Sequence, residues 1–271
     1  MNPDQDGFDH VARDAAELHR HLTRYLRGHA PARWSQMIRA GAHFTVPEAW
    51  SILSPSKMAA NLVRTERERI EGAPLYALGP SASSAAIEAG EAGIVLTPDA
   101  LPAPSGSIYF RHPIAVPGPD RVGSARIVTW GAPPPSMGLP GMWLTWYVDL
   151  RKHTAPAAAA IAAMQPDARV MLDQENFLRF LPAIDNRLIP GEPPPDETAR
   201  ILRTVLLALF AIKTGLMPTV QLQAPHPGPG TTTVRVADVP TQDLPALPLT
   251  VARAAGQHSI DVIKRHQSEA D

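Results

Sequence analysis

The sequence predicts an α+β fold, with N-terminal helices, a central antiparallel sheet and a buried C-terminal helix packed on that sheet. Three observations support this fold class. Residues 9–28 repeat apolar side chains at spacings of three and four, which is the period of a helix. Residues 105–150 contain three segments rich in β-branched and aromatic side chains, which favour strands. Residues 205–212 are apolar on every side, as in a buried helix.

The chain is expected to form one domain over residues 1–271. Hydrophobic residues make up 44% of the sequence and charged residues 19%, which is the balance of a globular rather than a disordered protein. Within the domain we expect a helical portion at about 1–95 and a mixed β/α portion at about 96–256. The polar tail at 257–271 is expected to fray.

The clearest amphipathic helix is predicted over residues 9–28. Asp6 or Asp9 can cap its start, and Gly28 ends it. Its side chains divide into an apolar face and an arginine face. The apolar face comprises Val11, Ala15, Leu18, Leu22, Tyr25 and Leu26, and the opposite face carries Arg13, Arg20, Arg24 and Arg27.

The run Ser-Pro-Ser-Lys at 54–57, together with Lys-Thr-Gly at 213–215, resembles two elements of serine penicillin-binding enzymes and β-lactamases. In that family the serine is a nucleophile with a lysine one turn later. The family's third element, Ser-x-Asn or Tyr-x-Asn, is absent from any plausible position, and Lys213 closes a predicted helix instead of lying on a strand. We therefore interpret Ser54 as the cap of a helix over 55–71, in which the run RTERER is a solvated polar stretch.

The middle of the chain predicts an antiparallel meander of three strands, SGSIYFRHPIAV, ARIVTW and GMWLTWYVDL. The third segment carries aromatic side chains on both of its alternating faces, so we expect it to be central and covered on each side. Short helices are expected near 83–89 and from Pro156. A further helix is predicted at about 197–213, ending at Gly215, and TTTVRVADV is read as a late strand.

Composition excludes several classes of function. The formal net charge is −1, so any binding to nucleic acid or to an anionic membrane must come from a local patch. The absence of cysteine excludes disulfides, thiol nucleophiles and cysteine-ligated zinc. The acidic N-terminus is unlike a secretory signal, and the apolar run at 205–212 is far shorter than the roughly 20 residues of a membrane-spanning helix. We expect a soluble cytoplasmic protein.

The leading candidate site is a basic surface on the first helix and the segment after it. Between Leu18 and Pro47 the sequence contains five arginines and no acidic residue. Arginine binds phosphate bidentately, and an aromatic ring can stack on a base. The alternative is a solvated helix face, because Glu17 is spaced for ordinary ion pairs with its arginine neighbours. The predicted binding residues are Arg20, Arg24, Arg27 and Arg33, with Trp34 as a stacking group.

A second candidate site lies at the end of the strand over 141–150. Asp149, Arg151 and His153 could serve there as acid, anchor and base of an unrecognised enzyme. A hydrophobic sheet centre explains the neighbouring tryptophans with fewer assumptions and is the favoured interpretation. No metal site is predicted, because His19 and His21 are two residues apart and point away from each other on a helix. No cofactor is predicted either.

These patterns favour a non-catalytic interaction protein that binds nucleic acid or an acidic partner through its arginine-rich first helix. The alternatives are the enzyme with a pocket near Asp149, and a structural or assembly subunit whose apolar surface is buried against copies or partners. No protein family is recognised from the sequence.

Overall fold

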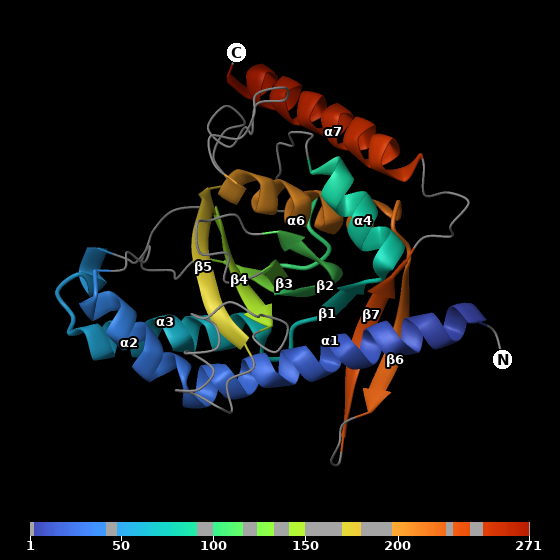
Figure 1. Ribbon diagram of the computed structural model, residues 1–271. Helices are drawn as coiled ribbons and strands as arrows, with labels where there is room; N and C mark the ends of the chain where they lie inside the picture. The colour runs from blue at the N-terminus through green and yellow to red at the C-terminus, as the bar shows by residue number, and fades with distance from the viewer. Residues whose placement is uncertain are drawn as a thin grey trace.

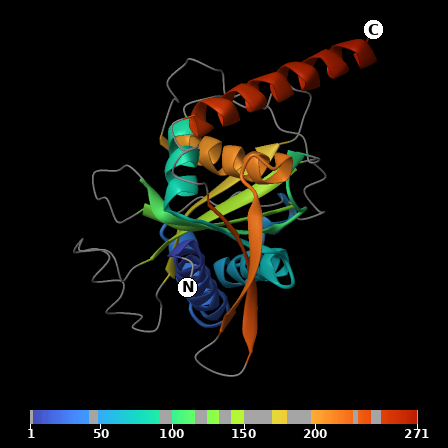
Figure 2. The same ribbon diagram turned by 90° about the vertical axis from the view of Figure 1, so that its right-hand side faces the viewer.

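The fold is a seven-stranded sheet between two layers of helices (Figures 1 and 2). It is taken from a computed structural model, which describes residues 3–41, 48–90, 100–115, 124–132, 141–149, 170–179, 197–225, 230–238 and 246–270. The lower layer holds α1 (Pro3–Gly28), α2 (Ala30–Arg39), the single turn η1 (Glu48–Trp50) and α3 (Pro55–Ile70). The upper layer holds α4 (Pro80–Ala89), α6 (Glu197–Thr214) and α7 (Leu247–Ala270).

The sheet has the strand order β5-β4-β3-β2-β1-β7-β6. Its strands β2, β3, β4 and β5 form an antiparallel meander, which confirms the three strands predicted in the middle of the chain. β1 pairs in parallel with both β2 and β7, so the sheet as a whole is mixed. The bounds are β1 Leu75–Leu78, β2 Gly106–Ala115, β3 Ser124–Gly131, β4 Gly141–Asp149, β5 Val170–Arg179, β6 Thr219–Pro225 and β7 Thr231–Ala237.

Two apolar cores lie on the two faces of the sheet. β4 shows how one strand serves both, since Trp146 belongs to the upper core and Tyr147 to the lower, and each is completely buried. This confirms the prediction of a strand covered on both sides. The helix predicted to be buried, α6, packs into the upper core through an unbroken series of buried residues at 203–211. All six residues predicted for the apolar face of α1 are buried in the lower core.

Several elements differ from the sequence prediction. β1, β5, β6 and α7 were not predicted, and the tail expected to fray from residue 257 continues α7 to Ala270. The run RTERER was wrongly interpreted as solvated, because Glu66 and Arg69 within it are 2% and 6% exposed. The helix predicted from Pro156 lies outside the described residues.

Among the described helices, none combines the length and the apolar character that crossing a membrane requires.

Candidate functional site

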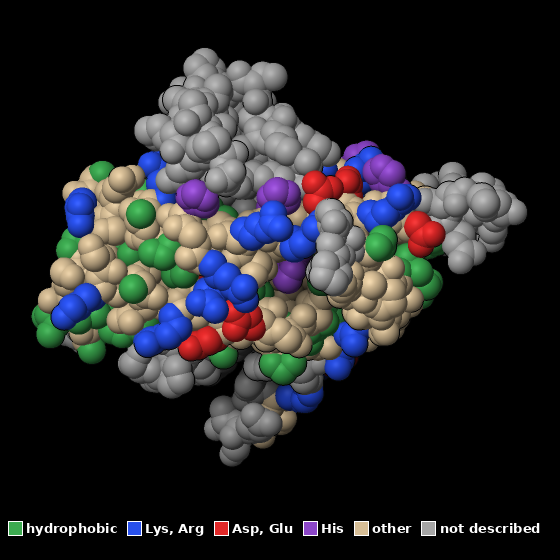
Figure 3. All heavy atoms as spheres, turned by 90° about the horizontal axis from the view of Figure 1, so that it is seen from below, with side chains coloured by type: hydrophobic (Ala, Val, Ile, Leu, Met, Phe, Trp, Pro, Cys, Tyr) green, Lys and Arg blue, Asp and Glu red, His purple; other side chains and the backbone are tan. Residues whose placement is uncertain are grey.

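The outer side of α1 presents arginines over the lower face of the molecule. Arg24 and Arg27 are exposed, and Arg20, one turn earlier, is partly exposed. Their spacing of three or four residues places them about 4.5–6 Å apart along the helix axis. Arg33 lies on the next helix, α2, and is also partly exposed. Figure 3, which views the molecule from below, shows arginine and lysine side chains gathering on this face beside fewer acidic ones.

Most of these arginines are not neutralised within the described part of the chain. Arg20, Arg24 and Arg33 form no ion pair there, and the buried Nε atoms of Arg20 and Arg33 have no hydrogen-bond partner. Arg27 does pair with a carboxylate, at 3.5 Å from Glu71 Oε1. The same oxygen accepts a hydrogen bond of 2.8 Å from Arg67, so two guanidinium groups share one carboxylate.

The two arginines change the pKa of Glu71. The hydrogen bond and charge of Arg67 lower the pKa of its carboxyl, and those of Arg27 lower it further. The carboxylate therefore stays ionised, yet it balances only one of the two positive charges. The end of α1 and the end of α3 together carry an excess of positive charge at the surface.

Trp34 does not lie on this surface. It is 2% exposed and belongs to the lower core, where its indole Nε1 donates a hydrogen bond of 3.2 Å to the Tyr25 hydroxyl. The predicted stacking role is therefore wrong, because both faces of the ring are covered by protein. Arg20, Arg24 and Arg27 therefore lie together on one side of α1, whereas Trp34 lies in the core and not at the predicted site.

The Asp149 site falls almost entirely outside the described residues. Asp149 is the last residue of β4, opposite Val170 of β5, while Arg151 and His153 are not described. The proposed pocket therefore stays a prediction from sequence. Among the described residues, no group of three or more His, Asp or Glu side chains is arranged to hold a metal ion.

Ser54 is the N-cap of α3. Its hydroxyl accepts a hydrogen bond of 3.4 Å from the backbone nitrogen of Lys57, and Pro55 occupies the first helical position. Lys213 is exposed in the last turn of α6, and Gly215 follows with a φ of 77°. Since α3 and α6 lie on opposite faces of the sheet (Figure 1), Ser54 and Lys213 do not form one site, and the capping interpretation is confirmed.

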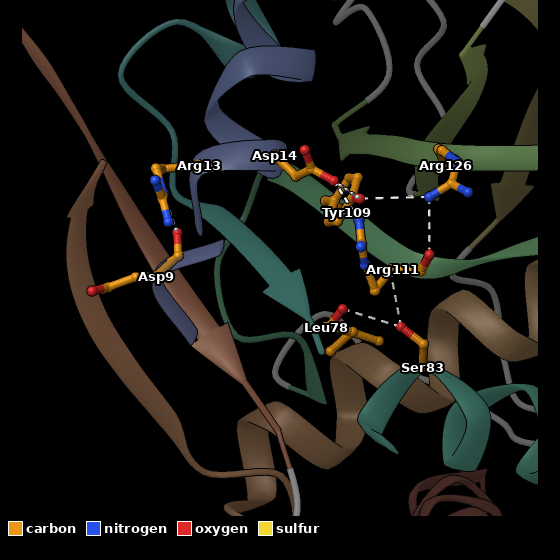
Figure 4. Close-up of polar contacts among 8 residues, drawn as sticks. All are labelled: Asp9, Arg13, Asp14, Leu78, Ser83, Tyr109, Arg111 and Arg126. Carbon is orange, nitrogen blue, oxygen red and sulfur yellow. Dashed lines mark hydrogen bonds and ion pairs between the residues drawn. The ribbon is translucent and has the colours of Figure 1, made fainter. Parts of the chain in front are cut away.

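A polar cluster that the sequence did not indicate joins α1 to β2 and β3 (Figure 4). Asp14 Oδ2 accepts hydrogen bonds from Arg111 Nη1 at 2.5 Å and from the Tyr109 hydroxyl at 3.2 Å. Arg126 Nη1 donates to the Arg111 carbonyl oxygen at 2.9 Å and lies 3.5 Å from the Tyr109 hydroxyl. The Arg111 backbone nitrogen donates to Ser83 on the upper side, at 3.1 Å.

The cluster is partly buried, with the side chains of Asp14 and Arg111 24% and 30% exposed. Burial, followed by the negative charge of Asp14, raises the pKa of Tyr109, so its phenol remains a hydrogen-bond donor. Two guanidinium groups and one carboxylate leave the cluster positively charged. Because each group binds another within it, its evident role is to fix α1 against the sheet, which holds the arginine side of α1 in place.

A second network is fully buried between α3, β3 and β4. Glu66 Oε2 accepts a hydrogen bond of 2.8 Å from Arg69, and Glu66 Oε1 accepts one of 2.8 Å from the Tyr147 hydroxyl and another from Thr129. Burial and the charge of Glu66 raise the pKa of Tyr147 well above its usual value. Both oxygens of the carboxylate therefore accept hydrogen bonds inside the core.

Comparisons with protein-family profiles, with curated proteins and with solved structures gave no match.

Proposed function

We propose that this protein is a non-catalytic interaction protein that holds the phosphate backbone of nucleic acid on the outer side of α1. The observation that carries the proposal is the lack of ion pairs at Arg20, Arg24 and Arg33 within the described residues. Guanidinium groups offer a fork of donors that matches phosphate oxygens, and an unpaired guanidinium has donors to offer. A cytoplasmic location belongs to the same proposal.

The buried position of Trp34 defines the kind of binding. Because Trp34 is buried, its ring is not available to stack on a base. Contacts to phosphate alone position a nucleic acid without reading its sequence. We therefore expect duplexes of different sequence to bind with similar affinity, through charge.

A salt titration tests the proposal. Fluorescence anisotropy with a labelled duplex DNA should show affinity falling steeply with salt, because each phosphate contact releases counterions. Contacts from Arg20, Arg24 and Arg33 correspond to a slope of roughly −3 in a plot of log affinity against log salt. A flat salt response would contradict the proposal. Binding of polyglutamate but not of DNA would instead assign the surface to an acidic protein.

Charge reversal at a single position locates the surface. Arg24→Glu should weaken DNA binding severalfold and reduce the salt slope by about 1 or more. Arg253→Glu is the matched control, since Arg253 is also an exposed helical arginine but lies on α7 in the upper layer (Figure 1). Equal losses in the two variants would mean that overall charge, and not this surface, determines binding.

A further inference from the structure

The outer edge of the described sheet is formed by β6, the last strand in its order. β6 pairs with β7 through seven consecutive residues without a register shift, and in the described sheet no strand pairs with its other side. Sheet edges are commonly blocked by charged side chains, by proline, by bulges or by a covering element. The one proline of β6, Pro225, is its last residue, so it can block only the end of the edge. β6 carries no charged residue, and five of its residues are exposed, namely Thr219, Val220, Gln221, Gln223 and Pro225.

The lower face of β6 is apolar and incompletely covered. Val220, Leu222 and Ala224 alternate onto this face, where Ala224 and Leu222 pack in the lower core against α1. Ala224 is 2% exposed, whereas Val220 on the same face is 51% exposed. α1 therefore covers one end of the strand and leaves apolar surface open at the other.

α1 also extends beyond the edge of the sheet. Figure 1 shows its N-terminal turns crossing the β6–β7 hairpin and continuing past it, and Figure 2 shows this end of the helix beside β6 when the edge faces the viewer. Any strand added beside β6 would lie over these projecting turns.

We propose that a second copy of this chain occupies the edge, with the two β6 strands pairing antiparallel about a twofold axis at Leu222. In this register Val220 faces Ala224 of the partner copy, Gln221 faces Gln223, and Thr219 faces Pro225. The pairing brings no like charges together, because β6 has none. The two sheets become continuous across the interface.

The twofold arrangement also accounts for the exposed valine. In each copy, α1 covers Ala224 of the same chain. In the dimer Val220 lies beside Ala224 of the partner copy, so the partner's α1 lies next to it. The projecting turns of each α1 thus lie beneath the other strand. Symmetric antiparallel pairing is the isologous contact expected of a closed dimer.

The mass of the purified protein tests this interface. Light scattering after size exclusion should give twice the chain mass of 29.2 kDa, and Val220→Lys should halve that mass. Ile260→Lys is the matched control, because Ile260 is 47% exposed in the middle of α7, in the upper layer of helices (Figure 1), so its variant should remain dimeric. A monomeric wild type, or a Val220→Lys variant with unchanged mass, would refute the dimer.

Cross-linking tests the register independently. The chain contains no cysteine, so a single introduced thiol reports only contacts between copies. Leu222→Cys should form an intermolecular disulfide on mild oxidation, because residues directly opposite place their Cβ atoms roughly 5 Å apart. Thr219→Cys should not, since the two Thr219 positions would be roughly 20 Å apart. The reverse pattern, or equal cross-linking of both, would overturn this register.

Discussion

The Tyr147 hydroxyl donates a hydrogen bond of 2.8 Å to Glu66 Oε1, and this contact joins α3 to β4 across 81 residues of sequence. The same carboxylate binds Arg69, and both members of this ion pair are buried. Removing one member of a buried pair leaves a desolvated charge, which is far more destabilising than losing a surface pair.

Glu66→Ala should therefore destabilise the protein by about 3–5 kcal/mol, measured by urea unfolding. Tyr147→Phe removes one donor to the carboxylate and should cost about 1.5–3 kcal/mol. The control is Glu68→Ala, because Glu68 is 69% exposed and pairs with Arg64 only at 4.0 Å. Its variant should stay within about 0.5 kcal/mol of wild type. Comparable losses at Glu66 and Glu68 would contradict a structural role for the buried network.

Sequence patterns predicted the elements whose side chains repeat regularly. The spacing of Leu18 and Leu22 in α1, and the alternation of Trp146 and Tyr147 in β4, are direct consequences of helix and strand geometry. β1 escaped prediction because it is four residues long and buried on both faces, so it shows no alternation. A four-residue apolar run is compatible with several structures.

The candidate sites were harder to predict because they depend on contacts between distant residues. Glu66 and Arg69 have the spacing of a solvated helical ion pair. Their burial depends on contacts of Glu66 with Thr129 and Tyr147, which lie far away in the sequence. Trp34 follows an arginine and suggested a surface site, but its partner is the Tyr25 hydroxyl in the core. The arginines of α1 were placed correctly on the outer side because helical periodicity alone defines that side.

Glu71→Gln should strengthen binding of DNA to the arginine surface. The change releases Arg27 and Arg67 from the carboxylate that they share, which adds two available guanidinium groups. We expect the salt slope to steepen by about 1–2. Glu68→Gln makes the same change of charge on α3, but Glu68 pairs only weakly with Arg64, so it should have a smaller effect. Equal effects of the two changes, or weaker binding by Glu71→Gln, would argue against Glu71 as a competitor for the arginines.

His19 on α1 should make stability depend on pH. Burial lowers its pKa from 6.5 to about 4, so the folded state disfavours the charged imidazole. Above pH 6.5 the histidine is neutral in both states and has no effect. As the pH falls below 6.5 the unfolded chain takes up the proton first, and the loss of stability levels off below pH 4, at no more than roughly 3–4 kcal/mol.

His19→Gln should remove this part of the pH dependence. Urea unfolding at intervals between pH 7 and 4 would show a shallower loss of stability in the variant than in wild type. His10→Gln provides the control, because His10 lies on the same helix and is exposed. If His19→Gln and wild type lose stability in parallel, His19 does not titrate as its burial requires.

Gly106 at the start of β2 should not tolerate a side chain. A methyl group there would lie 2.6 Å from the ring of Trp130 and 2.8 Å from the carbonyl oxygen of Pro74. Neither neighbour can move freely, because Trp130 is fully buried with its indole hydrogen-bonded to Ala103, and the Pro74 oxygen accepts from Ser107. Gly106→Ala should therefore destabilise the protein by about 1–3 kcal/mol in urea unfolding.

Gly256 provides the opposite case for the same substitution. It lies inside α7, and a methyl group there would meet nothing within 4 Å. Gly256→Ala should stabilise the protein by about 0.5–1 kcal/mol, because alanine loses less backbone entropy than glycine on forming a helix. Opposite signs at the two positions would show that β2 packs closely against Trp130 and that α7 is helical through Gly256. A destabilised Gly256→Ala variant would instead place another part of the molecule against that side of α7.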